Sequence, residues 1–227
     1  MAWRYWTLIV AALLSVGCHS APTSGGKEVG AKGPIGLNDP WPDYVRRTPF
    51  PVRASGDYVH EGTGLVLPVT AGPFVRERIM QFDDEGLDIA ASYEMPNTHR
   101  QKILVSVYVY PITGSMPDIT PARAASEDTC LDEFKGVENA ALHVFINPKL
   151  VDEKPIAAPH PDFKPGRLAI FDADGGRNFP VFTGRVRSES YVFCGRNPLW
   201  VLKYRITYEQ SADVRSSIDA LFSAVPR

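Results

Sequence analysis

Apolar and polar residues alternate along the middle of this chain in a pattern typical of β-strands. From Gly64 onward, turn residues separate four segments rich in Val, Ile, Tyr and Phe: LVLPV, PFVRERIMQF, LDIAASYEM and QKILVSVYVYP. Residues 83–86, with the sequence DDEG, predict a hairpin turn between the second and third segments, and residues 96–97 predict the next bend. In the fourth segment the odd positions of 103–109 place Ile and Val on one face, and the even positions of 106–110 place Ser and Tyr on the other. Both faces of this segment are therefore expected to be at least half covered, as in a sheet with helices packed on it.

Two other segments have the spacing of amphipathic helices. Thr120 followed by Pro121 predicts a helix start, and Ser211 is expected to cap a closing helix. The apolar stripe of the first helix comprises Cys130, Phe134, Val137, Ala141 and Phe145. The inward residues of the closing helix are Val214, Ile218, Leu221 and Val225.

The remaining segments complete the expected fold. Residues 147–166 carry repeated prolines and predict a long ordered crossover, with a short edge strand at 155–158. Residues 167–195 predict two or three strands with a turn at 174–176, and residues 199–208 alternate in the manner of a half-buried strand. The order of strands, helix, strands and helix predicts an α+β fold, with a mainly antiparallel sheet and packed helices.

This order of elements over residues 63–225 resembles the PsbP-like fold of extrinsic photosystem subunits and their bacterial relatives, an antiparallel sheet between helices. The resemblance lies in element order, with no shared motif. It therefore implies a fold and assigns no functional residue.

The N-terminal residues have the layout of an export signal. Arg4 supplies a positive charge, residues 6–16 are mostly apolar, and Gly17 precedes Cys18. The apolar run is shorter than the roughly 20 residues that span a bilayer. Val16, Gly17 and Cys18 resemble the lipobox of bacterial lipoprotein precursors, although Ser15 stands where lipoboxes usually have Leu.

That resemblance implies a signal peptide of residues 1–17, removed before Cys18, whose thiol and new amino group receive lipid such as palmitate. Because no Asp follows Cys18, the resemblance favours the outer membrane, with the domain facing the periplasm. The alternative is a plain secretory leader in which the cysteine is incidental.

Residues 18–50 are rich in Gly, Pro and small residues, so we expect a lipidated N-terminus and flexible tether. Trp41 and Tyr44 either dock on the domain or are incidental linker aromatics. Residues 51–227 are then expected to form a single periplasmic domain.

With Cys18 assigned to lipid, Cys130 and Cys194 are the remaining cysteines of the chain. Two cysteines in an oxidising compartment usually pair, which predicts a disulfide. The alternative is two separately buried free thiols.

The charge balance excludes one class of partner. The chain holds 24 Lys plus Arg against 26 Asp plus Glu, and removal of residues 1–17 takes away only Arg4, which leaves 23 against 26, or −3. Nucleic-acid binding needs a concentrated basic surface, so we expect no such partner.

Motifs of hydrolases, metal sites and phosphate-binding loops are missing from the sequence, so no cofactor, metal or catalytic residue is assigned. The histidines His60, His99, His143 and His160 are expected to be surface or capping residues. Residues 172–175, DADG, match the start of a calcium loop without its distal glutamate, so a hairpin turn is expected there.

Aromatic residues offer one candidate binding surface. A groove for a sugar or peptide would form if they shared a sheet face near basic residues; otherwise they are core beneath a helix. The residues concerned are Tyr108, Tyr110, Tyr191, Tyr204 and Tyr208, with Arg187, Lys203 and Arg205.

The sequence thus predicts a lipid-anchored cell-envelope protein, held to the membrane through its lipid. Its domain is expected to bind or support an envelope protein, peptide or sugar and to do no chemistry. The alternative is a small periplasmic hydrolase with His143 or His160 as base.

Overall fold

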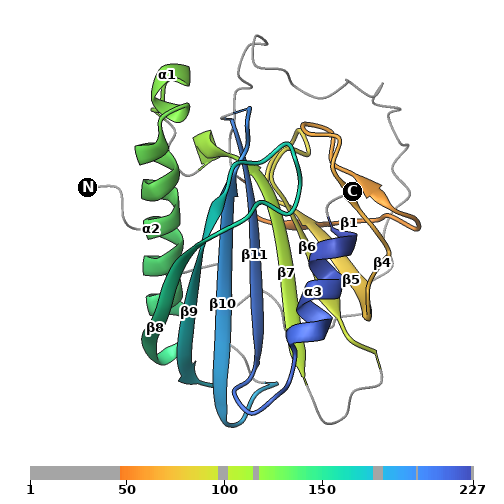
Figure 1. Ribbon diagram of the computed structural model, residues 1–227. Helices are drawn as coiled ribbons and strands as arrows, with labels where there is room; N and C mark the ends of the chain where they lie inside the picture. Colours follow the sequence, from red (N-terminus) through yellow and green to blue (C-terminus); the bar gives the residue numbers. More distant parts are fainter. Residues whose placement is uncertain (1–46, 97–101, 115–117, 176–180, 198, 226–227) are drawn as a thin grey trace.

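The computed structural model describes residues 47–96, 102–114, 118–175, 181–197 and 199–225. In these residues the chain has the predicted α+β fold, a large antiparallel sheet with packed helices (Figure 1). The strands are β1 (Phe50–Val52), β2 (Tyr58–Val59), β3 (Val66–Leu67), β4 (Thr70–Ala71), β5 (Phe74–Gln81), β6 (Ile89–Glu94), β7 (Ile103–Pro111), β8 (Ile146–Ile156), β9 (Gly166–Asp174), β10 (Arg185–Cys194) and β11 (Trp200–Glu209). The helical elements are η2 (Ile112–Gly114), α1 (Pro121–Ala124), α2 (Glu127–Val144) and α3 (Arg215–Ala224).

Two antiparallel meanders join to make the main sheet. Its strand order is β1-β5-β6-β7-β11-β10-β9-β8, and β4 pairs with β5 beside β1. The first meander runs from β5 to β7 and the second from β8 to β11, and they meet where β11 pairs with β7. The helices α1 and α2 lie between the two meanders in the chain, while β2 and β3 form a separate small hairpin.

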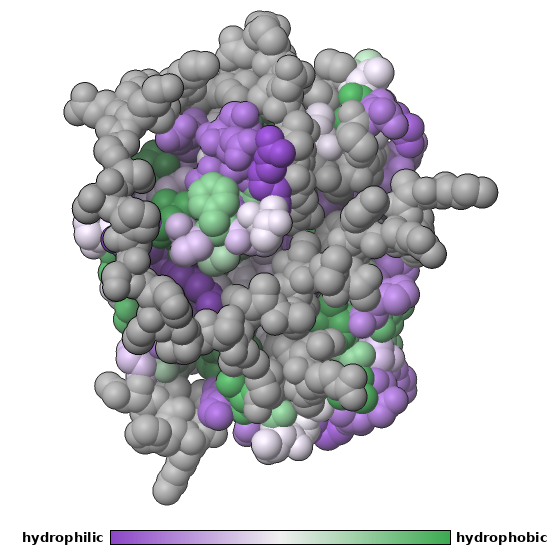
Figure 2. Space-filling view, turned by 180° about the vertical axis from the view of Figure 1, so that it is seen from behind, coloured by the Kyte–Doolittle hydropathy of each residue, from purple (hydrophilic) through white to green (hydrophobic). Residues whose placement is uncertain are grey.

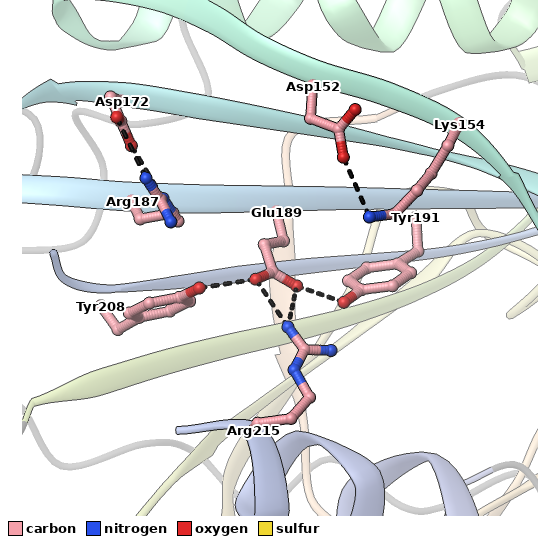
Figure 3. A network of polar contacts seen from close by, with 8 residues as sticks. All are labelled: Asp152, Lys154, Asp172, Arg187, Glu189, Tyr191, Tyr208 and Arg215. Carbon is pink, nitrogen blue, oxygen red and sulfur yellow. Dashed lines mark hydrogen bonds and ion pairs between the residues drawn. The ribbon is translucent and has the colours of Figure 1, made fainter. Parts of the chain in front are cut away.

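The two faces of the sheet pack against different helices. We call the face that packs against α3 the front face; its apolar residues include Ile103 and Val105 of β7, which cluster with Ile218 of α3. We call the opposite face the back face, where Phe134 of α2 clusters with Phe171 of β9. Figure 3 shows both helices on opposite sides of the strands, α2 above and α3 below.

Most of the predicted strands are confirmed. The four segments after Gly64 contain β3, β5, β6 and β7, and the bend at residues 83–86 separates β5 from β6. Gly86 has a φ of 76°, a conformation that suits glycine. The strand predicted at 199–208 is β11, but it is buried on both faces rather than half-buried, because Lys203 and Thr207 are also covered.

The crossover predicted for residues 147–166 is wrong. Residues 146–156 form β8, a long edge strand that pairs with β9 through two register shifts. Pro148 and Pro155 are compatible with this strand because an edge strand leaves one side without ladder hydrogen bonds. The predicted edge strand at 155–158 therefore begins much too late.

The two predicted helices lie where the sequence placed them, but each begins at a different residue from the predicted one. Thr120 and Pro121 begin only the short α1, and α2 starts after Ser126, whose Oγ accepts a hydrogen bond from Thr129 N at 3.3 Å. Ser211 does not cap the closing helix, since α3 begins at Arg215 after Val214. The apolar stripes of both helices nevertheless face the sheet as expected.

Candidate functional site

A buried carboxylate on the front face organises the polar network drawn in Figure 3. Glu189 of β10 is 1% exposed. Its Oε1 accepts hydrogen bonds from Tyr208 Oη at 2.5 Å and Arg215 Nη2 at 2.9 Å. Its Oε2 accepts from Tyr191 Oη and from Arg215 Nη2 at 3.1 Å. We call these four residues the Glu189 network.

The Glu189 network holds the start of α3 against the sheet. Arg215 is the first residue of α3, so its ion pair with Glu189 joins the helix to the middle of β10. Burial, reinforced by the carboxylate, raises the pKa of Tyr191 and Tyr208 well above the usual value, so both hydroxyls keep their protons as donors. Since both carboxylate oxygens have donors, the network is suited to stabilising the fold.

A second ion pair lies beside it on the same face. Arg187 donates from Nε and Nη2 to the two oxygens of Asp172 at 2.8 and 3.1 Å, and Gln210 Nε2 donates to Asp172 at 2.8 Å. Asp172 lies within β9, which runs to Asp174, so the turn predicted at 172–175 starts too early. An open depression near this end of the sheet is lined by Thr183, Gly184, Arg185, Glu209, Gln210 and Ser211.

Of the two alternatives for the aromatic residues, the structure does not form the groove, because the five tyrosines divide between the two faces. Tyr191, Tyr204 and Tyr208 belong to the front core, where Phe222 of α3 lies 4.7 Å from the rings of Tyr191 and Tyr204. Tyr108 and Tyr110, with Lys203 and Arg205, are on the back face. Burial raises the pKa of Tyr204, whose hydroxyl donates to Val225 O at 2.7 Å. The front tyrosines are thus core beneath a helix.

The described histidines do not come together. His60 is fully buried; its Nδ1 accepts from Thr63 N at 3.1 Å and its Nε2 lies 3.0 Å from Leu87 O, which assigns the proton to Nε2. Burial lowers the pKa of His60 to about 4. His143 bonds to a backbone oxygen of its own helix at 2.6 Å. His99 lies outside the described residues.

His160 is the one of these histidines with a nearby carboxylate. Its Nδ1 lies 3.4 Å from Asp162 Oδ2, but it also accepts a hydrogen bond from Asp162 N at 3.3 Å. In a catalytic triad that nitrogen would donate to the carboxylate. No hydrogen bond joins His160 to a serine in the described part of the chain.

On the back face α2 covers the half of the sheet formed by β8, β9 and β10. The predicted disulfide between Cys130 and Cys194 joins α2 to the end of β10, with Cα atoms 6.0 Å apart. Glu133 of α2 accepts a hydrogen bond from Tyr110 Oη at 2.6 Å. Lys203 Nζ lies 4.1 Å from the ring centroid of Tyr108 and 5.4 Å from that of Tyr110.

Beside α2 a row of polar side chains crosses five strands of the back face. Successive pairs are direct cross-strand partners, from β5 through β6, β7 and β11 to β10. We call this row the polar band; it consists of Arg78, Ser92, Ser106, Arg205 and Ser190. With strands about 4.8 Å apart, the row is about 19 Å long.

Three atoms of the polar band are buried without a hydrogen-bond partner: Arg78 Nε, Arg205 Nε and Ser190 Oγ. Ser190 is 0% exposed, whereas Arg205 is half-buried and the Arg78 side chain is 34% exposed. Buried polar groups are nearly always paired, so these donors mark a place where a partner is missing. Figure 2, turned by 180° from the view of Figure 1, shows hydrophilic and hydrophobic residues side by side on the surface of the described part of the chain.

Of the polar band, sequence analysis singled out only Arg205, as one of the basic residues near the candidate aromatic groove. The signal was present as alternation, since Arg205 alternates with apolar residues along β11. What aligns the five residues is the register of five strands, which the sequence of one strand does not give. The cysteine pairing, in contrast, followed from composition alone.

No protein-family model matches this chain, and no curated protein sequence does. Across the described ranges, no cluster of three or more His, Cys, Asp or Glu is arranged to hold a metal ion. Within those same ranges, no helix has the length and apolar character needed to cross a bilayer. Cys18, the predicted lipidation site, lies outside the described residues.

Proposed function

We propose that this chain is a lipid-anchored protein of the bacterial cell envelope, attached through Cys18, whose periplasmic domain binds a partner and does no chemistry. The observation that carries the binding role is the polar band, where buried donors lack partners on a sheet face beside α2. The Glu189 network, by contrast, is satisfied within the protein and offers no free group to a ligand.

The location rests on residues at the start of the chain and on the disulfide. The lipobox-like sequence that ends at Cys18 supports lipid attachment. The disulfide between Cys130 and Cys194 supports an exported domain, because disulfides persist in oxidising compartments. The absence of Asp after Cys18 favours the outer membrane.

Metabolic labelling with a palmitate analogue tests the anchor. The wild-type protein should be labelled and should fractionate with the outer membrane, whereas Cys18→Ser should be unlabelled. The matched control is the double variant Cys130→Ala with Cys194→Ala, which keeps Cys18 and should still be labelled. Equal labelling of wild type and Cys18→Ser, or a soluble unlabelled wild type, would contradict the proposed anchor.

A further inference from the structure

The back face of β5 and β6 lies away from the helix that covers the rest of that face. The helix α2 packs against β8, β9 and β10, at the other end of the sheet (Figure 1). In one row across β5, β6 and β7, Met80, Ala90 and Tyr108 are direct cross-strand partners. Met80 and Tyr108 are half-buried, and the small Ala90 lies between them. An aromatic ring placed over Ala90 would therefore contact the two larger side chains as well.

The described part of the chain begins beside this row. The backbone N–H of Arg47, the first described residue, donates to Phe82 O at 2.6 Å, and Phe82 directly follows β5, two residues after Met80. An extended chain spans at most about 3.6 Å per residue, so Tyr44 lies within about 11 Å of Arg47 and Trp41 within about 22 Å. Because neighbouring strands are about 4.8 Å apart, both aromatic rings can reach the row.

The segment before Arg47 has a composition suited to docking on this row. Residues 40–46 read PWPDYVR, and Pro42 biases the residue before it toward an extended backbone. The two prolines also lower the entropy that the segment loses when it becomes ordered. Asp43 lies between the two aromatic residues.

A cation on the same face complements that aspartate. Arg78 lies on β5 two residues from Met80, so the two side chains share the back face. The Nε of Arg78 is buried without a hydrogen-bond partner, and its ion pair with Glu77 is distant, at 3.9 Å. Its side chain is 34% exposed, so a carboxylate can approach the guanidinium group.

Phe50 is the alternative contact for the two rings. It is 40% exposed, and its cross-strand partner Gln81 pairs with Ile89 of the front core, so Phe50 lies on the front side of β1. A ring on Phe50 would place the segment on the side of the sheet opposite to Arg78. The back face therefore offers the better match, since it combines apolar contacts with a charge partner.

We propose that residues 41–46 dock on the back face of β5 and β6. The rings of Trp41 and Tyr44 pack on Met80, Ala90 and Tyr108, and Asp43 faces Arg78. The docked segment leaves residues 18–40 as the tether between the lipid and the domain. The contact needs no lipid on Cys18, so it can be tested separately from the proposed anchor.

Tryptophan fluorescence of the full-length protein in detergent tests the proposal. Subtracting the spectrum of Trp41→Phe from that of the wild type isolates the emission of Trp41, which should peak at a shorter wavelength than N-acetyltryptophanamide in water. Met80→Gln and Asp43→Lys, each measured with and without Trp41→Phe, should move this peak to a longer wavelength. The matched control is Phe50→Gln, which adds an amide on the front side of the same edge and should leave the peak unchanged.

Denaturant unfolding provides a second measurement. Trp41→Ala should lower the folding equilibrium constant about tenfold, as expected for loss of a packed aromatic ring. When Trp41→Ala is combined with Met80→Gln, the two losses should be less than additive, because both remove the same contact. When it is combined with Phe50→Gln, the losses should add.

Three results would overturn the proposal. A Trp41 peak at the wavelength of the free compound would mean that the ring is exposed to water. A short-wavelength peak that neither Met80→Gln nor Asp43→Lys changes would mean that the ring contacts the detergent, as it would a membrane. A peak that moves in Phe50→Gln and stays in Met80→Gln would place the segment on the front side. If Met80→Gln does not fold, Asp43→Lys decides the result, because Asp43 precedes the described part of the domain.

Discussion

Glu189 and Ser190 are consecutive residues of β10 that point to opposite faces of the sheet, and both are buried, at 1% and 0% exposed. On the front face each oxygen of Glu189 has two donors. On the back face the hydroxyl of Ser190 has no partner. A difference this large between neighbours cannot come from local sequence, so it reflects what covers each face.

The front face is covered by α3, and its polar groups fasten that helix. The back face is covered by α2 only over one half, where the disulfide fastens the helix covalently. Beside α2, the back face keeps polar residues such as Arg205 and Lys203 at positions that an internal core would fill with apolar ones. The comparison teaches that the satisfied buried groups of this protein contribute to stability, whereas the unsatisfied ones cost stability.

The largest expected effect is on the front face. Replacement of Glu189 by Ala leaves two buried tyrosine hydroxyls without an acceptor and removes the ion pair to Arg215. The free energy of unfolding should fall by roughly 3–5 kcal/mol, measured by chemical denaturation. The control Glu94→Ala removes an exposed carboxylate from the back face and should change stability by less than about 0.5 kcal/mol. A loss below about 1 kcal/mol for Glu189→Ala would contradict the role of the network.

The disulfide on the back face should give the next largest effect. Its residues are 64 apart in sequence, so the closed loop restricts the unfolded chain considerably. The double variant Cys130→Ala with Cys194→Ala should lose about 2–4 kcal/mol of unfolding free energy. A reductant should destabilise the wild type by a similar amount and leave the double variant unchanged. If the reductant destabilises both equally, it acts elsewhere than on this bond.

A satisfied buried group that titrates should make stability depend on pH. His60 has a folded pKa of about 4 against the usual 6.5, so below pH 6.5 the unfolded chain binds a proton that the folded protein does not. Stability should therefore fall as the pH drops from about 6.5 to about 4, with a loss of about 2 kcal/mol at pH 5.

Two variants isolate this contribution from that of the carboxylates. His60→Gln does not titrate, so its unfolding free energy should change less between pH 7 and pH 5 than that of the wild type. The exposed His143→Gln should keep the wild-type pH dependence. If both variants follow the wild type, His60 does not control stability in this pH range.

The comparison of the faces also explains which features the sequence predicted. The apolar positions of β7 and the stripe of α2 were predicted because burial against one layer repeats at a fixed period. The sequence did not separate the tyrosines of the front face from those of the back face. The order in which the strands pair decides which tyrosines share a face, and the sequence does not give that order. The polar band depends on five registers, and therefore appears only in the folded sheet.

The long edge strand shows another limit of sequence patterns. β8 is largely exposed and contains Pro148 and Pro155, so it has neither the apolar run nor the alternation of a buried strand. Its strand conformation follows from pairing with β9, which is a tertiary contact. Ser211 failed as a cap for a related reason, since the ion pair of Arg215 with Glu189 fixes where α3 meets the sheet.

The smallest expected effect compares two serines of the same strand and face. Ser188 and Ser190 are both fully buried on β10, but the Ser188 hydroxyl lies 3.1 Å from Thr207 Oγ1 while that of Ser190 has no partner. Ser188→Ala should lose about 1 kcal/mol of unfolding free energy, because it leaves the Thr207 hydroxyl without that partner. Ser190→Ala should leave stability unchanged or raise it by up to about 1 kcal/mol, because it removes an unsatisfied hydroxyl. Denaturant unfolding of the two variants side by side measures the difference in unfolding free energy. An equal loss for both variants would mean that the Ser190 hydroxyl has a hydrogen-bond partner in the folded protein. The back face would then differ less from the front face than we infer.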